Sequence, residues 1–189
     1  MQMRRFAAVA ITSGALVAGV AGTALPAGAT TRTDGFGVEA TTVQRGSVTG
    51  AAAQKMARGS GQQLVLPQMT NAAGGTVHAT SCRYVERTRG RKTSRHGRWI
   101  IYVKTRLTWC YDGLHVNSAR VNRSAYTYNK RTWRMKGWRQ RSLTHGSTWA
   151  SVLAKSQYTF YYTGNRHYYR PYADVMGAFN GSYRTWVGG

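Results

Sequence analysis

The chain has 189 residues, and its 27 lysines and arginines far outnumber its five acidic residues, which gives a net charge of +22 at pH 7. So few carboxylates argue against an enzyme that needs two acids facing one cleft, such as a typical glycosidase. An excess of cations this large favours partners that are polyanions.

The first 29 residues have the pattern of a secretory signal peptide. A basic start (Arg4 and Arg5) precedes a weakly apolar stretch, and the Ala-Gly-Ala sequence at 27–29 provides a cleavage site. The alternative is a membrane anchor, but several glycines and two hydroxyl residues make the run too polar for a comfortable span. Cleavage after Ala29 leaves 160 residues with a net charge of +20, because two basic residues and no acidic residue are lost.

No second apolar run is long enough to cross a bilayer, so we expect no stable membrane insertion once the signal is removed. The product is then secreted and extracellular, either free or associated with the cell wall. The length of the remaining chain suits one domain.

Residues 30–75 are rich in Thr, Gly, Ala and Gln and show no sustained hydrophobic period. Such a segment buries too little apolar surface to offset its ordering entropy. We predict a flexible spacer or a cleaved propiece here. The stretch Leu64 to Met69 is a candidate for a short edge strand, a position in which Pro67 is tolerated.

From Thr76 to the end, at residue 189, the composition changes to Trp, Tyr, Val and Thr, and apolar residues alternate with polar ones. Between Arg98 and Tyr111 the odd positions are mostly apolar, while the even ones include the cations Arg98, Lys104 and Arg106. This alternation predicts a half-buried strand. The preceding run, Thr76 to Arg87, alternates as well.

The two cysteines fit a hairpin between these two strands. Pairing Cys82 with Cys110 across the basic loop also places Glu86 opposite Arg106 on the same face, so a single register predicts a disulfide and an ion pair. An exported chain with two cysteines usually joins them, and the bond would contribute roughly 3 kcal/mol. Buried free thiols are the alternative, and a metal site is a weaker one because no ligand spacing accompanies the cysteines.

The Asp112-Gly113 dipeptide is typical of a tight turn and predicts that the Cys110 strand returns in a second hairpin. A two-residue turn would set Trp109 against Val116 and Leu107 against Ser118. The inward residues then switch to Ala119 and Val121, which predicts a bulge near Asn117 and Ser118.

Later segments repeat this logic, with a turn near Asn129, an alternating strand after Ser147 and a hairpin around Asn180-Gly181. About seven short strands without a long helix predict an all-β fold, an antiparallel β-sandwich of Ig-like architecture over residues 76–189 with one disulfide. A small closed barrel is the alternative.

The sequences TWCYDGLHV, SAYTY, WRMKGW and VMGAFNGSYRTW together resemble a family of small secreted actinobacterial proteins of unknown function. The resemblance covers about residues 80 to 187, and its most specific element is the turn from Trp109 to Gly113. It implies export and a β fold, and it implies no mechanism. Members of that family carry further cysteines in the second half that this chain lacks, so no second disulfide is expected.

Catalytic and metal-binding residues are not evident, and we expect no cofactor and no metal. The five histidines are scattered without metal-ligand spacing. The segment YYTGNRHYYRPY resembles the Tyr-rich end of small exported microbial ribonucleases, which implies His167 as an acid, and Glu86 would have to approach it in space to act as the base. No nucleophile elbow is present.

The positive charge is concentrated in two stretches that also carry aromatic residues, 83–106 and 120–141. Cations mixed with aromatics can neutralise a phosphate backbone and stack on bases. They suit the teichoic acids and acidic polysaccharides of a cell envelope equally well, and a basic surface with only general adhesion is the simplest alternative. The predicted polyanion-binding residues are Arg87, Arg89, Arg91, Lys92, Arg95, Arg98, Tyr102, Lys104 and Arg106.

Overall fold

The computed structural model describes residues 36–48, 61–65 and 81–189. The predicted signal peptide and most of the predicted spacer lie outside these residues. Within the described ranges the chain forms ten strands and no helix. In particular, this part of the chain has no helix long and apolar enough to cross a lipid bilayer.

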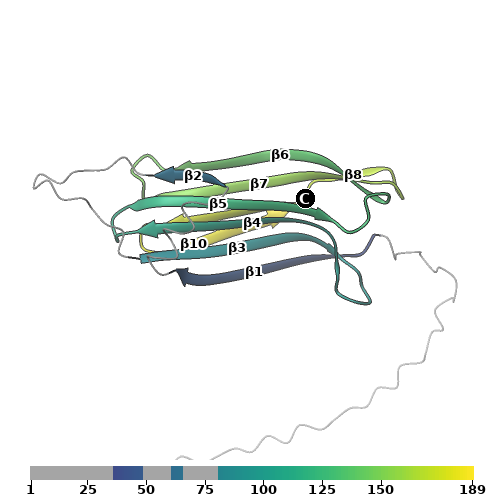
Figure 1. Ribbon diagram of the computed structural model, residues 1–189, viewed down its shortest axis with the longest axis horizontal. Helices are drawn as coiled ribbons and strands as arrows, with labels where there is room; N and C mark the ends of the chain where they lie inside the picture. The colour runs from purple at the N-terminus through teal and green to yellow at the C-terminus, as the bar shows by residue number, and fades with distance from the viewer. Residues whose placement is uncertain (1–35, 49–60, 66–80) are drawn as a thin grey trace, which may run out of the picture. The chain divides into compact units, whose positions relative to one another are not determined.

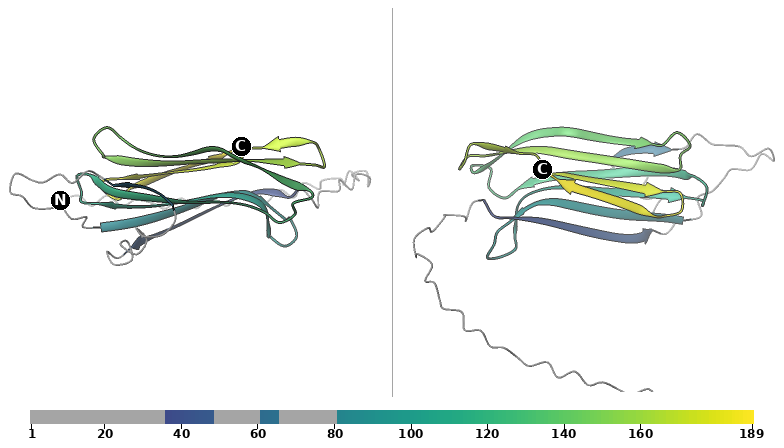
Figure 2. Two further views of the ribbon diagram at one scale, coloured as in Figure 1. Left: turned by 45° about the horizontal axis from the view of Figure 1, so that its top comes forward. Right: turned by 180° about the vertical axis from the view of Figure 1, so that it is seen from behind.

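The strands form two antiparallel sheets, which confirms the predicted β-sandwich (Figure 1). Figure 2 shows the two layers from other directions. The first sheet, in the order β1-β3-β4-β5-β2, consists of Val38–Val48, Ser81–Lys92, Trp99–Tyr111, Val116–Thr127 and Gln62–Val65. The second sheet, in the order β10-β9-β7-β6 with β8 also paired to β7, consists of Tyr183–Gly188, Tyr172–Ala178, Ser151–Tyr162, Trp133–His145 and His167–Tyr169.

Two stretches of residues 30–75, the segment predicted to be a flexible spacer or a cleaved propiece, form strands, so a flexible spacer is wrong for these two stretches. β1 pairs with β3 over its whole length, from Val38 opposite Lys92 to Val48 opposite Cys82. β2 pairs with β5 and includes Leu64 of the predicted edge strand, whereas Pro67 lies outside the described residues. Both are edge strands, whose stability comes from the hydrogen bonds of the neighbouring strand more than from their own side chains.

The core between the sheets consists of two apolar clusters. One contains Leu107 and Trp109 of β4, and the other contains Val103 of β4 with Phe160 of β7. Between them the first sheet carries a row of three directly opposed residues, Arg87, Thr105 and Arg123, on β3, β4 and β5. This polar row crosses the middle of the sandwich.

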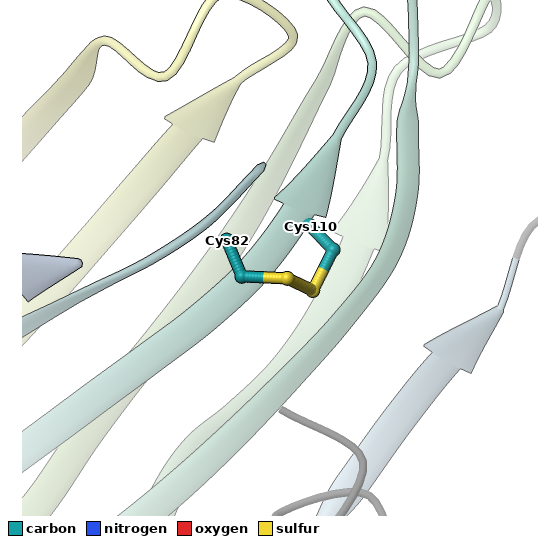
Figure 3. Close-up of a disulfide and its surroundings, with 2 residues drawn as sticks. All are labelled: Cys82 and Cys110. Carbon is teal, nitrogen blue, oxygen red and sulfur yellow. A yellow bond between two sulfur atoms is a disulfide. The ribbon is translucent and has the colours of Figure 1, made fainter. Parts of the chain in front are cut away.

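The predicted register of the β3–β4 hairpin is confirmed. Cys82 is opposite Cys110, Glu86 is opposite Arg106, and the two cysteines form a disulfide with a Cα–Cα distance of 4.0 Å (Figure 3). Each half-cystine is 8 % exposed. The bond therefore joins two adjacent central strands near the end of β4.

Asp112 is a turn residue, as predicted, but the turn is longer than two residues. Its carboxylate accepts hydrogen bonds from the backbone N–H groups of Leu114 (2.8 Å) and His115 (2.7 Å). Leu107 is opposite Val121 and Tyr111 is opposite Val116, so the predicted register is wrong. The register shift at this end of β5 agrees with the predicted bulge.

Candidate anion-binding surface

The structure distributes the nine predicted binding residues over three places. Successive side chains of a strand point to opposite faces, and directly opposed residues share a face. We call the face of the first sheet that points away from the second sheet the outer face. It carries Lys92, Tyr102, Lys104 and Arg106. The face toward the second sheet carries Arg87, Arg89 and Arg91, and the β3–β4 loop carries Arg95 and Arg98.

Aromatic rings form a short row on the outer face. Tyr102 on β4 and Tyr126 on β5 are directly opposed, and their rings stack at 5.2 Å with an angle of 19° between the planes. The Trp99 ring meets Tyr102 edge-on at 5.6 Å. Tyr126 is 38 % exposed, and Tyr128, just beyond the end of β5, is 70 % exposed. Flat rings are therefore open to solvent at this end of the sheet.

The outer-face cations flank this aromatic row. The Lys92 ammonium lies 4.6 Å from the centroid of the Trp99 ring, and the Arg106 guanidinium lies 4.1 Å from that of Tyr84. Glu86 forms its ion pair with Lys104, at 3.3 Å, so the predicted partner Arg106 is wrong. Register fixes which Cα atoms are opposed, but a diagonal neighbour within reach of a long side chain can still capture the carboxylate. Arg106 is thereby left stacked on an aromatic ring.

Arg91 lies between the sheets and holds the start of β1. Its guanidinium donates to the carbonyls of Phe36 (2.7 Å) and Gly37 (2.8 Å) and stacks on the Phe36 ring at 3.7 Å. Burial lowers the pKa of Arg91, although the nearby Glu39 and Tyr169 act in the opposite direction. Arg91 thus has a structural role that its position in a basic hairpin does not reveal.

Other arginines on the same side of β3 and β1 also contact groups of the protein. Arg89 forms an ion pair with Glu39. Arg83 donates to the Gly181 carbonyl (2.9 Å), and Arg45 donates to the Tyr183 hydroxyl (2.8 Å). The ion pair joins β3 to β1, and the contacts of Arg83 and Arg45 join this side of the first sheet to the β9–β10 hairpin.

The loop between β3 and β4 projects two further cations. Arg95 and Arg98 are exposed. The loop is closed by hydrogen bonds from the Thr93 N–H to the Arg98 carbonyl (2.8 Å) and from the Gly97 N–H to the Thr93 carbonyl (3.0 Å). Gly97 has a φ of 60°, the left-handed conformation that glycine adopts at little cost.

A second group of cations and rings, on the second sheet, is missing from the predicted residues. Tyr161 on β7 is opposite Tyr168 on β8, with ring centroids 5.0 Å apart. Lys136 lies 5.7 Å from the Tyr161 centroid, and Arg170 lies 5.9 Å from that of Tyr168. The tyrosine-rich segment after residue 160 was the sequence feature that could have predicted this group. It does so only once the pairing of β7 with β8 is known, because that pairing brings Tyr161 and Tyr168 together.

The residues weighed for ribonuclease chemistry lie on different sheets. Glu86 is on the outer face of the first sheet, and His167 begins β8 of the second sheet, where its ring nitrogen Nδ1 is 2.9 Å from the Asn165 carbonyl. Among the described residues, no three His, Cys, Asp or Glu side chains gather as metal ligands.

Burial raises the pKa of Asp174, although the Ser156 N–H, Lys155 and Arg123 act in the opposite direction.

Comparisons of the chain with models of protein families, with curated proteins and with solved structures found no match. The similarity to secreted actinobacterial proteins therefore remains an expectation from the sequence. Any functional assignment depends on the surfaces described above.

Proposed function

We propose that this protein is a secreted, non-enzymatic binder of polyanions at the cell envelope, and that it belongs to the family it resembles in sequence. The observation that carries the proposal is the row formed by Trp99, Tyr102 and Tyr126 beside cations on the outer face of the first sheet. Teichoic acid and acidic polysaccharides are the expected ligands.

The composition of this surface supports the binding of an extended polymeric ligand. Lys92 and Arg106 contact rings and have no ion pair among the described residues, so their charges remain available to a ligand. Arg95 and Arg98 extend the positive charge beyond the end of the sheet. Each cation that neutralises a phosphate releases counterions, so affinity should fall linearly with the logarithm of salt concentration.

Single-stranded nucleic acid is the second candidate ligand. The stacked pair of Tyr102 and Tyr126, together with the exposed Tyr128, offers ring surfaces on which bases can stack. Stacking of this kind is worth about 1–3 kcal/mol per base and tolerates any sequence. If bases stack on Tyr126, replacing Tyr126 by Leu would weaken the binding of nucleic acid far more than the binding of teichoic acid.

The test measures binding to teichoic acid, peptidoglycan, RNA and DNA over a range of salt concentrations, with each polymer checked for cleavage. The double variant Lys92→Gln with Arg106→Gln should reduce affinity and flatten the salt dependence, because these two cations have no ion pair among the described residues. Its matched control is Arg134→Gln with Arg184→Gln, which removes the same charge from the second sheet.

Equal losses for the two double variants would mean that net charge alone governs adhesion, and a specific outer-face site would be ruled out. Cleaved RNA would overturn the non-enzymatic assignment. Preference for one polymer that persists at high salt would identify the ligand.

A further inference from the structure

A cleft lies at the edge of the first sheet where the short strand β2 begins beside β5, and its lining reaches the outer face at Asn122, which is opposite Arg106. Its volume is about 730 Å³, and the described residues lining it include Gln62, Arg123 and Arg141. β2 pairs only with Ser118 to Val121, so β5 continues past Val121 without a partner from β2. The cleft therefore opens at one edge of the sandwich.

The Arg123 guanidinium is fixed in this cleft by neutral acceptors. It donates to the Ser156 hydroxyl (2.9 Å), to the Gln62 side-chain carbonyl (3.2 Å) and to the Ser142 backbone carbonyl. These partners come from β7, β2 and β6, so both sheets orient the group. A guanidinium has five N–H donors, and some of them remain for a ligand.

The positive charge in the cleft is not balanced by a contacting carboxylate. Among the described residues, neither Arg123 nor Arg141 forms an ion pair with an acid. Burial and the nearby Arg141 lower the pKa of Arg123 to about 10, while Asp174 acts in the opposite direction. The two guanidinium groups therefore repel each other in a partly desolvated place, and an anion between them would relieve this repulsion.

We propose that Arg123 and Arg141 form a discrete binding site for a phosphate group, separate from the aromatic row of the outer face. Planar guanidinium groups bind tetrahedral oxyanions through paired hydrogen bonds, which an ammonium group cannot reproduce. Arg123 is the preorganised donor, and Arg141, which is exposed, closes on the ligand. The volume of the cleft leaves room for the substituents of a phosphodiester.

The test is calorimetric titration of the full chain with inorganic phosphate and, separately, with dimethyl phosphate, at constant ionic strength in chloride. One phosphate should bind per chain. Arg141→Gln should weaken binding at least tenfold, and Arg134→Gln, the same change on an outward-facing position of the same strand, should alter it less than twofold. Tighter binding of dimethyl phosphate would identify a phosphodiester as the ligand, and tighter binding of phosphate would identify a free or terminal phosphate.

Arg123→Lys serves as a second variant, because Arg123→Gln could disturb folding. A folded Arg123→Lys protein, as judged by circular dichroism, should bind phosphate at least tenfold more weakly. Absence of binding of both probes to the unmodified protein, or equal losses in Arg141→Gln and Arg134→Gln, would overturn the proposal. The outer-face variant Lys92→Gln with Arg106→Gln, whose charged groups lie on the rings of Trp99 and Tyr84, should retain phosphate binding, so failure of one proposal is distinguishable from failure of the other.

Discussion

The indole of Trp109 on β4 lies directly against Gly177 on β9, and a side chain at that glycine would overlap the ring. The indole Nε1 also donates a hydrogen bond to the Ala178 carbonyl (3.0 Å), and Trp109 is 1 % exposed. The two sheets are thus joined at this point by a large ring packed on bare backbone.

Gly177→Ala should therefore destabilise the protein by about 1–3 kcal/mol, because a well-packed ring must move to admit the methyl group. Thermal unfolding followed by tryptophan fluorescence measures the effect. Gly146→Ala is the control, since its Cβ would be an ordinary 3.5 Å from the Ser151 hydroxyl. Equal melting temperatures for the two variants would contradict the packing argument.

Removal of the disulfide should lower stability by about 3 kcal/mol through the greater entropy of the unfolded chain. For a chain of this size that corresponds to a fall in Tm of about 6–12 °C. The double variant Cys82→Ser with Cys110→Ser, measured by calorimetry, should match the unmodified protein under reducing conditions. A Tm unaffected by reductant would show that the hairpin register alone holds these strands.

Asp112→Ala should cost about 1 kcal/mol at neutral pH, by analogy with the loss of a capping side chain, because two backbone N–H groups lose their acceptor. Burial alone would raise the pKa of Asp112, but hydrogen bonds from His115 and Leu114 outweigh it and lower the pKa. The stabilisation is therefore present above pH 3.8 and disappears as the pH falls through the lowered pKa. Denaturant unfolding at several pH values tests this, with Asp112→Asn as the control that keeps the acceptor oxygen.

Substitution of Arg91 should lower the stability of the fold, whereas substitution of Arg106 should mainly lower polyanion binding, although both residues belong to the basic hairpin. Arg91→Gln should destabilise the fold by about 2 kcal/mol, because two charge-assisted hydrogen bonds to backbone carbonyls are lost. Arg106→Gln should change stability by less than about 0.5 kcal/mol and lower the salt dependence of polyanion binding by about one unit of slope. Denaturant unfolding and salt-dependent binding of both variants separate the two roles, and a purely stabilising Arg106 would count against the outer-face site.

Asp174→Asn should leave stability at pH 7 unchanged or raise the Tm by no more than about 3 °C. A carboxyl whose pKa is raised by burial binds its proton more tightly in the native state. Its titration therefore destabilises the native protein as the pH rises above 3.8, and this penalty is absent at lower pH. Asparagine can still accept a hydrogen bond from the Ser156 N–H. The Tm difference between the Asp174→Asn variant and the unmodified protein should therefore shrink as the pH is lowered. A Tm difference that grows at low pH would contradict the direction of the pKa shift.

The hairpin register was predictable from the sequence because two constraints coincided there. Alternation fixed the face of each residue, and Cys82 and Cys110 fixed which residues are opposed. The ion-pair partner of Glu86 was not predictable, since register does not decide between an opposed and a diagonal cation. The turn at Asp112 was identified correctly, but a carboxylate that bonds two backbone N–H groups supports a longer loop than the dipeptide suggests.

Two other features were missed for different physical reasons. β1 has the composition of a linker, and only the edge of β3 makes it a strand. Arg123 lies on the same inward face of β5 as Ala119 and Val121. A cation at an inward-facing position was the one feature of the sequence that could have indicated the cleft. Nothing local indicated that Ser156 and Gln62 would meet it, because they come from distant strands.

β1 covers one edge of β3 along eleven paired positions. If proteolysis removed the chain up to Thr76, β3 would present its unpaired backbone along a strand of twelve residues. Such an edge is a template for a strand from another copy. The site of cleavage would then decide which strand forms this edge of the first sheet, β1 in the intact chain and β3 in the trimmed chain.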